Sequence, residues 1–193
     1  YTFRGNFTFA KNKIVENDEP QRRYPYLSSR GLAVGTHHMY IAEGLFANES
    51  EIKAWPRQVF SVTRPGDVKY RDINGDGVID SYDQVPVGYP RLPQMSFGLG
   101  GTIAYKWFDV SIYFTGAAQS SIFLNGYSIW PFYDGEGVNN VLREYYDNRW
   151  TPDRLDARYP AIDRGNNPNN FLNSTIWLRN GNYLRLRNAE VGF

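Results

Sequence analysis

Apolar and polar residues alternate along three parts of the chain, and this alternation predicts four β-strands. In residues 1–10 every second position is aromatic apart from one glycine, a period of two that is typical of a strand with one apolar face. Residues 96–115 alternate on both sides of residues 106–107, which predicts a hairpin with a tight turn. Residues 176–193 change phase near Asn188, and a β-bulge there would explain the change.

Two long connections, residues 11–94 and 117–175, separate these strands. Asn48 followed by Glu51 resembles a capping box and predicts a short helix in the first connection. Apolar residues at helical spacing predict a second helix over residues 138–150. The Asn-rich stretch at residues 166–170 predicts a loop.

A meander of four strands places both long connections at the same end. Compact soluble domains rarely contain structureless connections longer than about 15 residues, whereas outer-membrane barrels combine long outside loops with short periplasmic turns and strands of about 9–11 residues. Four strands cannot close a barrel. We therefore predict an all-β fold, an arc of a large antiparallel up-and-down transmembrane β-barrel with long extracellular loops that contain short helices. A soluble sandwich would show the same alternation.

Composition narrows the possible partners. The net charge of +1 gives no electrostatic case for nucleic acid as a partner. Aromatic residues make up 17% of the 193 residues, which favours half-buried β-surface. The absence of cysteine leaves the redox compartment undetermined. No run of about 18 apolar residues indicates a transmembrane helix.

Residues 72–83 have the ligand spacing of an EF-hand-type calcium loop. Glycine falls at the sixth position, where such loops turn sharply, and the twelfth is Asp instead of the usual Glu. The upstream sequence is not helical, so the pattern predicts a structural Ca²⁺ loop and not a calcium sensor. The competing interpretation is a metal-free turn. The candidate ligands are Asp72, Asn74, Asp76, Val78, Asp80 and Asp83. Val78 would offer its backbone carbonyl, and the others would offer side-chain oxygens.

Residues 65–80, with the sequence PGDVKYRDINGDGVID, are followed by Val-Gly-Tyr-Pro at 87–90. Together with residues 4–7, 44–46, 107–111 and 182–188, they resemble the late-barrel signature of SusC/RagA-type TonB-dependent outer-membrane transporters. The matching segments occur in the same order and extend over essentially the whole chain.

This resemblance implies an outer-membrane location in a Gram-negative bacterium and a plugged barrel of about 22 strands. It also implies a SusD-like surface lipoprotein as partner, contact with outer-membrane lipid, and import of oligosaccharide or peptide cargo with energy supplied through TonB. Residues 1–193 would be a partial barrel domain, with the plug, the TonB-contacting segment and the remaining strands absent.

The sequence contains no constellation typical of a hydrolase, so we expect no enzymatic activity. His37 and His38 are neighbours and would point in opposite directions on an extended backbone, which suits no shared metal. The glycines of residues 98–101 lie within strand patterning and favour close backbone packing over a phosphate site. Arg4, Asn6, Asp109 and Ser111 fall on the polar strand face and would contact the lumen and plug.

An aromatic loop offers candidate contacts to substrate or partner at Trp130, Phe132 and Tyr133. These rings could stack on sugars or press on the partner, but packing within the loop is the favoured interpretation because long loops need a core of their own. Two other functions remain open. One is a soluble extracellular, calcium-stabilised carbohydrate-binding β-module; the other is a dockerin-like docking module, which would need a second calcium loop.

Overall fold

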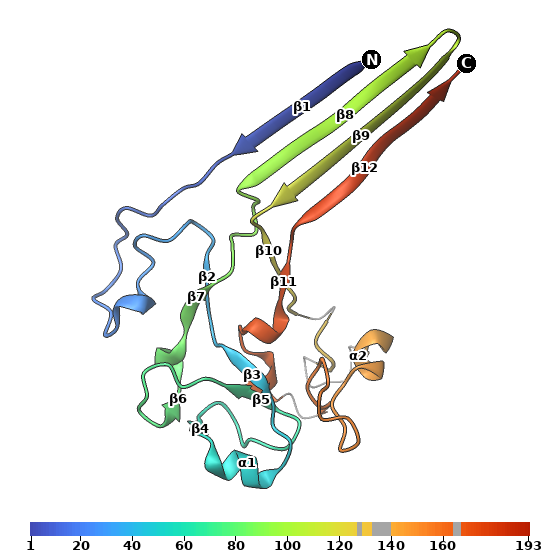
Figure 1. Ribbon diagram of the computed structural model, residues 1–193. Helices are drawn as coiled ribbons and strands as arrows, with labels where there is room; N and C mark the ends of the chain where they lie inside the picture. The colour runs from blue at the N-terminus through green and yellow to red at the C-terminus, as the bar shows by residue number, and fades with distance from the viewer. Residues whose placement is uncertain (127–128, 133–139, 164–166) are drawn as a thin grey trace.

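In the computed structural model, four long antiparallel strands form one sheet in the order β1-β8-β9-β12 (Figure 1). Their bounds are Thr2–Phe9 for β1, Met95–Tyr105 for β8, Phe108–Ala118 for β9 and Tyr183–Gly192 for β12. The structure describes residues 1–126, 129–132, 140–163 and 167–193. Within these residues the sheet is open, with β1 and β12 at its edges. The predicted strands and their meander are confirmed, and the part of the chain that the structure describes forms no closed barrel.

The turn and the bulge also lie where the pattern places them. Tyr105 pairs with Phe108 across the β8–β9 hairpin, and Lys106 takes a positive φ of 56° in the turn. The register between β12 and β9 shifts between Leu186 and Asn188, leaving Arg187 without a partner residue in the ladder. This is the bulge that restores the apolar residues of β12 to one face.

Each face of the four-stranded sheet has one chemical character. The pairs Phe7–Phe97 and Leu99–Phe114 place apolar residues on the same side of neighbouring strands. This apolar face is exposed; its members include Phe3, Phe7, Leu99, Ile103, Ile112, Phe114, Leu184, Leu186 and Val191. The opposite, polar face includes Arg4, Asn6, Thr102, Asp109, Ser111, Tyr113, Asn188 and Glu190.

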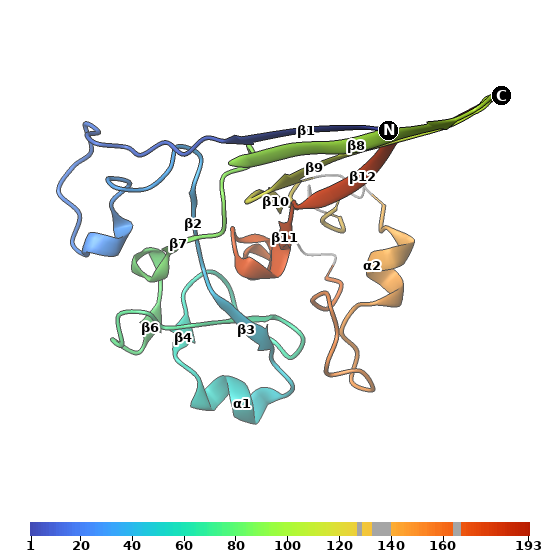
Figure 2. The same cartoon turned by 45° about the horizontal axis from the view of Figure 1, so that its top comes forward.

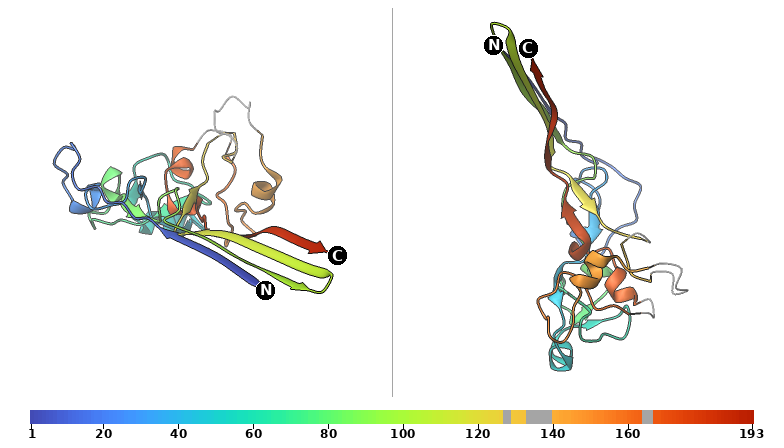
Figure 3. Two further views of the ribbon diagram at one scale, coloured as in Figure 1. Left: turned by 90° about the horizontal axis from the view of Figure 1, so that it is seen from above. Right: turned by 90° about the vertical axis from the view of Figure 1, so that its right-hand side faces the viewer.

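Both long connections gather at one end of the sheet. The β8–β9 turn and the two ends of the chain lie at the other end (Figure 1). Figure 2 shows the sheet nearly edge-on with the folded connections below one end, and both views of Figure 3 show the strands extending away from them. The arrangement confirms the predicted asymmetry between long and short connections.

The connections contain short elements that the sequence pattern did not predict. Strands β2, β3 and β10 pair antiparallel with β7, β5 and β11, and β4 pairs in parallel with β6. Two to four residues are too few to show a period, so alternation could not reveal these strands. The bounds are η1 Pro25–Leu27, β2 His37–Met39, β3 Ala42–Leu45, α1 Glu49–Ala54, β4 Arg57–Gln58, β5 Val68–Tyr70, β6 Val78–Ile79, η2 Ser81–Asp83, β7 Val85–Val87, β10 Ser121–Phe123, α2 Arg143–Asp147, η3 Pro168–Phe171, η4 Thr175–Trp177 and β11 Leu178–Asn180.

The two α-helices differ in how well they were predicted. Asn48 caps α1 by accepting a hydrogen bond from Glu51 N at 3.0 Å, as predicted, but the Glu51 carboxylate bonds to Ala47 N and not to Asn48 N. Helix α2 spans five residues, shorter than predicted, and Tyr145 is its one buried residue. Tyr146 is 54% exposed, so the apolar stripe does not pack as a unit.

Two hydrophobic cores lie within the connections, and we call the structure around them the loop cap. The first loop core is built on Tyr40, Val68, Tyr70 and Ile79. The second is built on Trp130, Tyr145, Tyr159 and Trp177. Ile176 packs against both cores, so the two long connections fold against each other.

Candidate functional site

The loop at residues 72–83 is closed by its own carboxylates. Asp72 accepts hydrogen bonds from the backbone N–H groups of Gly75 at 2.7 Å and Gly77 at 2.8 Å. Both glycines have positive φ, 75° and 83°, which allows the tight turn that brings their N–H groups to Asp72. Asn74 and Asp76 continue the pattern, accepting from Asp76 N and Val78 N at 2.9 Å each.

Asp83 closes the loop from its far end. Its side chain is fully buried, and its two oxygens accept from Ile73 N and Asp80 N, both at 2.8 Å. Asp80 in turn accepts from Tyr82 N at 2.7 Å and completes a capping box at the start of η2. Asp83 therefore connects the two ends of the loop through the backbone.

The residues of this loop suit a hard cation in their chemistry. The side-chain atoms that would bind the metal are all oxygens, the ligand type that Ca²⁺ prefers. A carboxylate has about four lone-pair positions, so bonds to backbone N–H leave capacity for a metal. Across the described residues, no three or more His, Cys, Asp or Glu side chains gather as a metal site. Calcium binding therefore stays a prediction.

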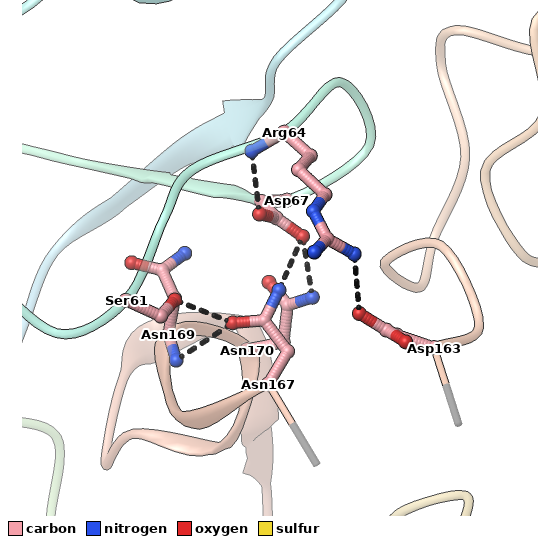
Figure 4. Close-up of polar contacts among 7 residues, drawn as sticks. All are labelled: Ser61, Arg64, Asp67, Asp163, Asn167, Asn169 and Asn170. Carbon is pink, nitrogen blue, oxygen red and sulfur yellow. Dashed lines mark hydrogen bonds and ion pairs between the residues drawn. The ribbon is translucent and has the colours of Figure 1, made fainter. Parts of the chain in front are cut away.

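A buried polar network connects the two long connections (Figure 4). Asp67, 3% exposed, accepts from Asn167 Nδ2 and Asn170 Nδ2 at 2.8 Å each, and from the backbone of Arg64 at 2.8 Å. The Arg64 guanidinium reaches Asp163 at 3.1 Å. A carboxylate from one connection thus satisfies side-chain amides about a hundred residues away along the chain.

The network extends through two further amides. Asn169 accepts from Gln58 Nε2 at 2.7 Å and donates to Val68 O at 3.0 Å. Gln58 also accepts from Tyr70 N at 2.7 Å, at the first loop core. Residues 166–170 were predicted to be a loop; residues 168–170 belong to η3, and the buried role of their asparagines was not predicted. The run of asparagines signalled a turn, and nothing local signalled its burial.

Burial raises the pKa of the Asp67 carboxyl above its ordinary value. Hydrogen bonds from Arg64 N, Asn170 and Asn167 oppose this effect by stabilising the ionised form. The buried charge therefore makes the network sensitive to pH.

The aromatic loop is divided between core and surface. Trp130 is 5% exposed and stacks on Phe171 with ring centroids 5.2 Å apart, as the interpretation of packing within the loop predicts. Phe132 is partly buried, with φ of 51°. Tyr133 lies outside the described residues. Contact of these rings with a substrate or partner stays a prediction.

The two histidines lie on β2 and face different neighbours. The His37 ring lies 6.1 Å from the Phe123 ring, whereas His38 Nε2 lies 3.2 Å from Tyr26 O. They therefore share no site, as expected for adjacent residues on a strand.

The four predicted lumen residues share the polar face of the sheet. Arg4, Asn6 and Ser111 line a hollow of about 440 Å³ on this face. Asp109 lies nearer the β8–β9 turn, opposite Gly192 of β12. The arrangement leaves polar side chains available to whatever faces this side of the sheet.

Among the described residues, no helix combines the length and apolar character needed to cross a membrane.

No protein-family model matches the chain. Over 128 residues, 66% of the chain, it is 30% identical to TonB-dependent receptor P26 of Formosa agariphila and covers 12% of that protein. Over 202 aligned positions, 97% of the chain, it is 23% identical to TonB-dependent receptor P3 of the same organism and covers 19% of it. These similarities support a relationship to TonB-dependent receptors.

Proposed function

We propose that the chain forms an arc of the barrel of a SusC/RagA-type TonB-dependent transporter in the outer membrane. The observation that carries the proposal is the two-faced sheet, with one continuous apolar face that none of the described residues covers. Leu99 is 62% exposed and Ile103 63% exposed on this face. Exposed apolar area on this scale requires a partner or lipid, and β8 and β9, at eleven residues each, suit a membrane crossing.

The loop cap would lie outside the cell, where a SusD-like lipoprotein would contact it. Supporting this, a groove of about 530 Å³ opens beside α1 and is lined by Trp55, Val59 and Val62. Val62 is 79% exposed. The polar face of the sheet would contact the plug, and TonB would act through parts beyond this chain. The cargo class is oligosaccharide or peptide, and the protein's role is transport without catalysis.

We also propose that the loop at residues 72–83 binds Ca²⁺. Asp72, Asn74, Asp76, Asp80 and Asp83 would supply side-chain oxygens and Val78 its carbonyl. A bound cation would neutralise the acidic loop and hold it, together with η2 at its end, in its folded shape. These residues would hold the metal, and the surrounding backbone bonds would orient them.

The alternative of a soluble carbohydrate-binding module fits the sheet less well. A soluble module would bury its apolar strand face, whereas here the cores lie in the connections and not against the sheet. We therefore favour the barrel.

Single-cysteine labelling of the complete protein in intact cells tests the proposal, since this chain contributes no native cysteine. Ser50→Cys lies in α1 within the loop cap, and Lys106→Cys lies in the tight turn. A polymer-linked maleimide too large for porins should label Ser50→Cys in intact cells. It should label Lys106→Cys only after the outer membrane is opened.

Equal labelling of both positions in intact cells would refute the outer-membrane orientation. Cargo uptake should also stop when TonB is deleted, and uptake that survives this deletion would refute the transport mechanism.

A further inference from the structure

A second feature of the loop cap lies away from the polar network and the sheet. A pocket of about 520 Å³ opens between the segment around η1, strand β2 and helix η2. In Figure 1 this region lies where the blue segment around η1 approaches β2 and β7. Its lining includes two arginines and several small polar side chains, among them Arg22, Arg23, His38, Ser81, Tyr82 and Gln84.

The pocket walls are held by specific contacts. Tyr26 donates its hydroxyl to Tyr82 O at 2.8 Å, which attaches the segment around η1 to η2. Tyr24 stacks on Tyr26 at 5.3 Å and meets Tyr82 edge-on at 5.9 Å. His38 is tied to Tyr26 O at 3.2 Å. Three aromatic rings and two hydrogen bonds thus give this polar pocket a defined shape.

Arg23 is positioned on these rings. Its guanidinium carbon lies 5.4 Å from the Tyr24 centroid and 5.2 Å from that of Tyr82. Cation–π contact engages the face of a guanidinium and leaves the N–H groups at its edge available for a carboxylate or sulfate. Among the described carboxylates, none forms an ion pair with Arg23.

Two carboxylates, Glu19 and Asp83, lie near the pocket and take part in hydrogen bonds of their own. Glu19 accepts from Ser28 Oγ and from Ser29 N at 3.2 Å, and lies 4.0 Å from Arg22 Nε at the edge of ion-pair range. Asp83 is buried with both oxygens bonded to backbone N–H groups. The Arg22 side chain stays 46% exposed. The pocket therefore presents Arg23, which forms no ion pair with a described carboxylate, and beside it Arg22, whose side chain stays exposed although it lies within ion-pair range of Glu19.

The remaining lining suits hydroxyl groups. Gln84 donates Nε2 to Tyr40 at 3.0 Å, and its carbonyl oxygen remains a potential acceptor. Ser81 adds a hydroxyl that can donate and accept. The pocket thus places arginine side chains beside hydrogen-bond donors and acceptors. This combination matches a sugar ring that carries both an anionic group and hydroxyl groups.

We propose that this pocket binds an acidic sugar unit of the transported cargo, one that bears a carboxylate or a sulfate on its ring. Arg22 and Arg23 bind the anion, and Ser81 and Gln84 bind ring hydroxyls. The proposal rests on the proposed transport function and defines its cargo as an anionic oligosaccharide.

Calorimetric titration of the complete protein in detergent tests the proposal. The probes are a tetragalacturonate, a sulfated galactose tetrasaccharide, neutral galactotetraose and free sulfate. At least one acidic tetrasaccharide should bind about tenfold or more tightly than the neutral one, and more tightly than free sulfate. Whichever of the two acidic tetrasaccharides binds identifies the anion as a carboxylate or a sulfate. Equal binding of the neutral sugar, no binding of either acidic sugar, or free sulfate as the best ligand overturns the proposal.

Arg23→Gln should weaken binding of the acidic sugar about tenfold, the loss expected for charge-assisted hydrogen bonds. Arg143→Gln, which removes one charge from the exposed surface of α2, should leave it unchanged. Equal effects of the two variants would overturn the assignment. Cysteine labelling is independent of the pocket, so failed binding with correct labelling removes only this inference, whereas failed labelling removes the transport function.

Discussion

Tyr113 lies across Gly98 on the polar face of the sheet, so closely that a Cβ on this glycine would come within 2.2 Å of the tyrosine hydroxyl. The same ring covers Gly100, where a Cβ would come within 2.4 Å of Tyr113 Cδ2 and 2.6 Å of Ile112 O. These glycines thus provide space for an aromatic ring. At Gly100 the closeness of Ile112 O also fits the predicted close backbone packing.

The Gly98–Tyr113 contact predicts a double-mutant result. Gly98→Ala should lower the free energy of unfolding by about 1–3 kcal/mol, because the added methyl overlaps the ring. In a Tyr113→Ala background the same change should cost less, because the Asn6 side chain, whose Oδ1 would lie 2.3 Å from the added methyl, can then move into the space left by the ring. Urea unfolding of the four proteins measures the coupling, and strictly additive effects would contradict the contact. Gly100→Ala is the comparison, since its clash with Ile112 O should persist without the ring.

The apolar face predicts a difference between two arginine substitutions on β8. Leu99→Arg places a charge on the exposed apolar face, whereas Thr102→Arg places it beside the polar hollow. Folding into lipid vesicles should be weakened by about 2–4 kcal/mol for Leu99→Arg and little changed for Thr102→Arg. The folded fraction measured against urea tests this. Similar losses for both variants would argue against lipid on the apolar face.

Removal of Ca²⁺ should loosen residues 68–84 without unfolding the four long strands of the sheet. Calcium at about 100 times its dissociation constant adds about 2.7 kcal/mol to the bound form, so chelation should accelerate proteolysis of this region by up to about a hundredfold. Asp72→Ala should be cleaved rapidly with or without calcium, and the exposed control Asp153→Ala should behave like the wild type. Cleavage of the wild type at the same rate with and without chelator would disprove the calcium site.

The buried Asp67 predicts a pH dependence. Because burial raises the pKa of the Asp67 carboxyl in the folded state above its ordinary value, the folded form holds the proton more tightly. Its stabilising contribution is thus greatest below that value and is lost as pH rises through the folded-state pKa. The free energy of unfolding of the wild type, relative to that of Asp67→Asn, should therefore increase on acidification. Unfolding of the region around Trp177, followed at several pH values, measures this difference. A difference that is constant with pH would contradict this, and exposed Asp156→Asn controls for net charge.

Loss of the Asp67 side chain should be severe at neutral pH. Asp67→Ala leaves the amides of Asn167 and Asn170 without their acceptor in a buried site. We expect a loss on the order of 3 kcal/mol, seen as faster hydrogen exchange in both long connections together. Faster exchange in one connection alone would show that the network does not join them.

The long strands were predictable from sequence because each residue's face follows directly from its position. The phase change near Asn188 even located the bulge in β12. The loop cap was not predictable in the same way. Asn169 is completely buried although its neighbours indicate a turn, because its partners Gln58 and Val68 are distant in sequence. Helix α2 was overestimated since tertiary packing buries Tyr145 and contacts Val141 from this apolar spacing but leaves Tyr146 exposed.

The position of Ile176 in both loop cores affects how the mouth of a barrel could open. Either connection moving alone would expose Ile176 to water and break the bonds to Asp67. We therefore expect the two connections to move together as one unit. The lipoprotein partner proposed above, by contacting either connection, would then move both.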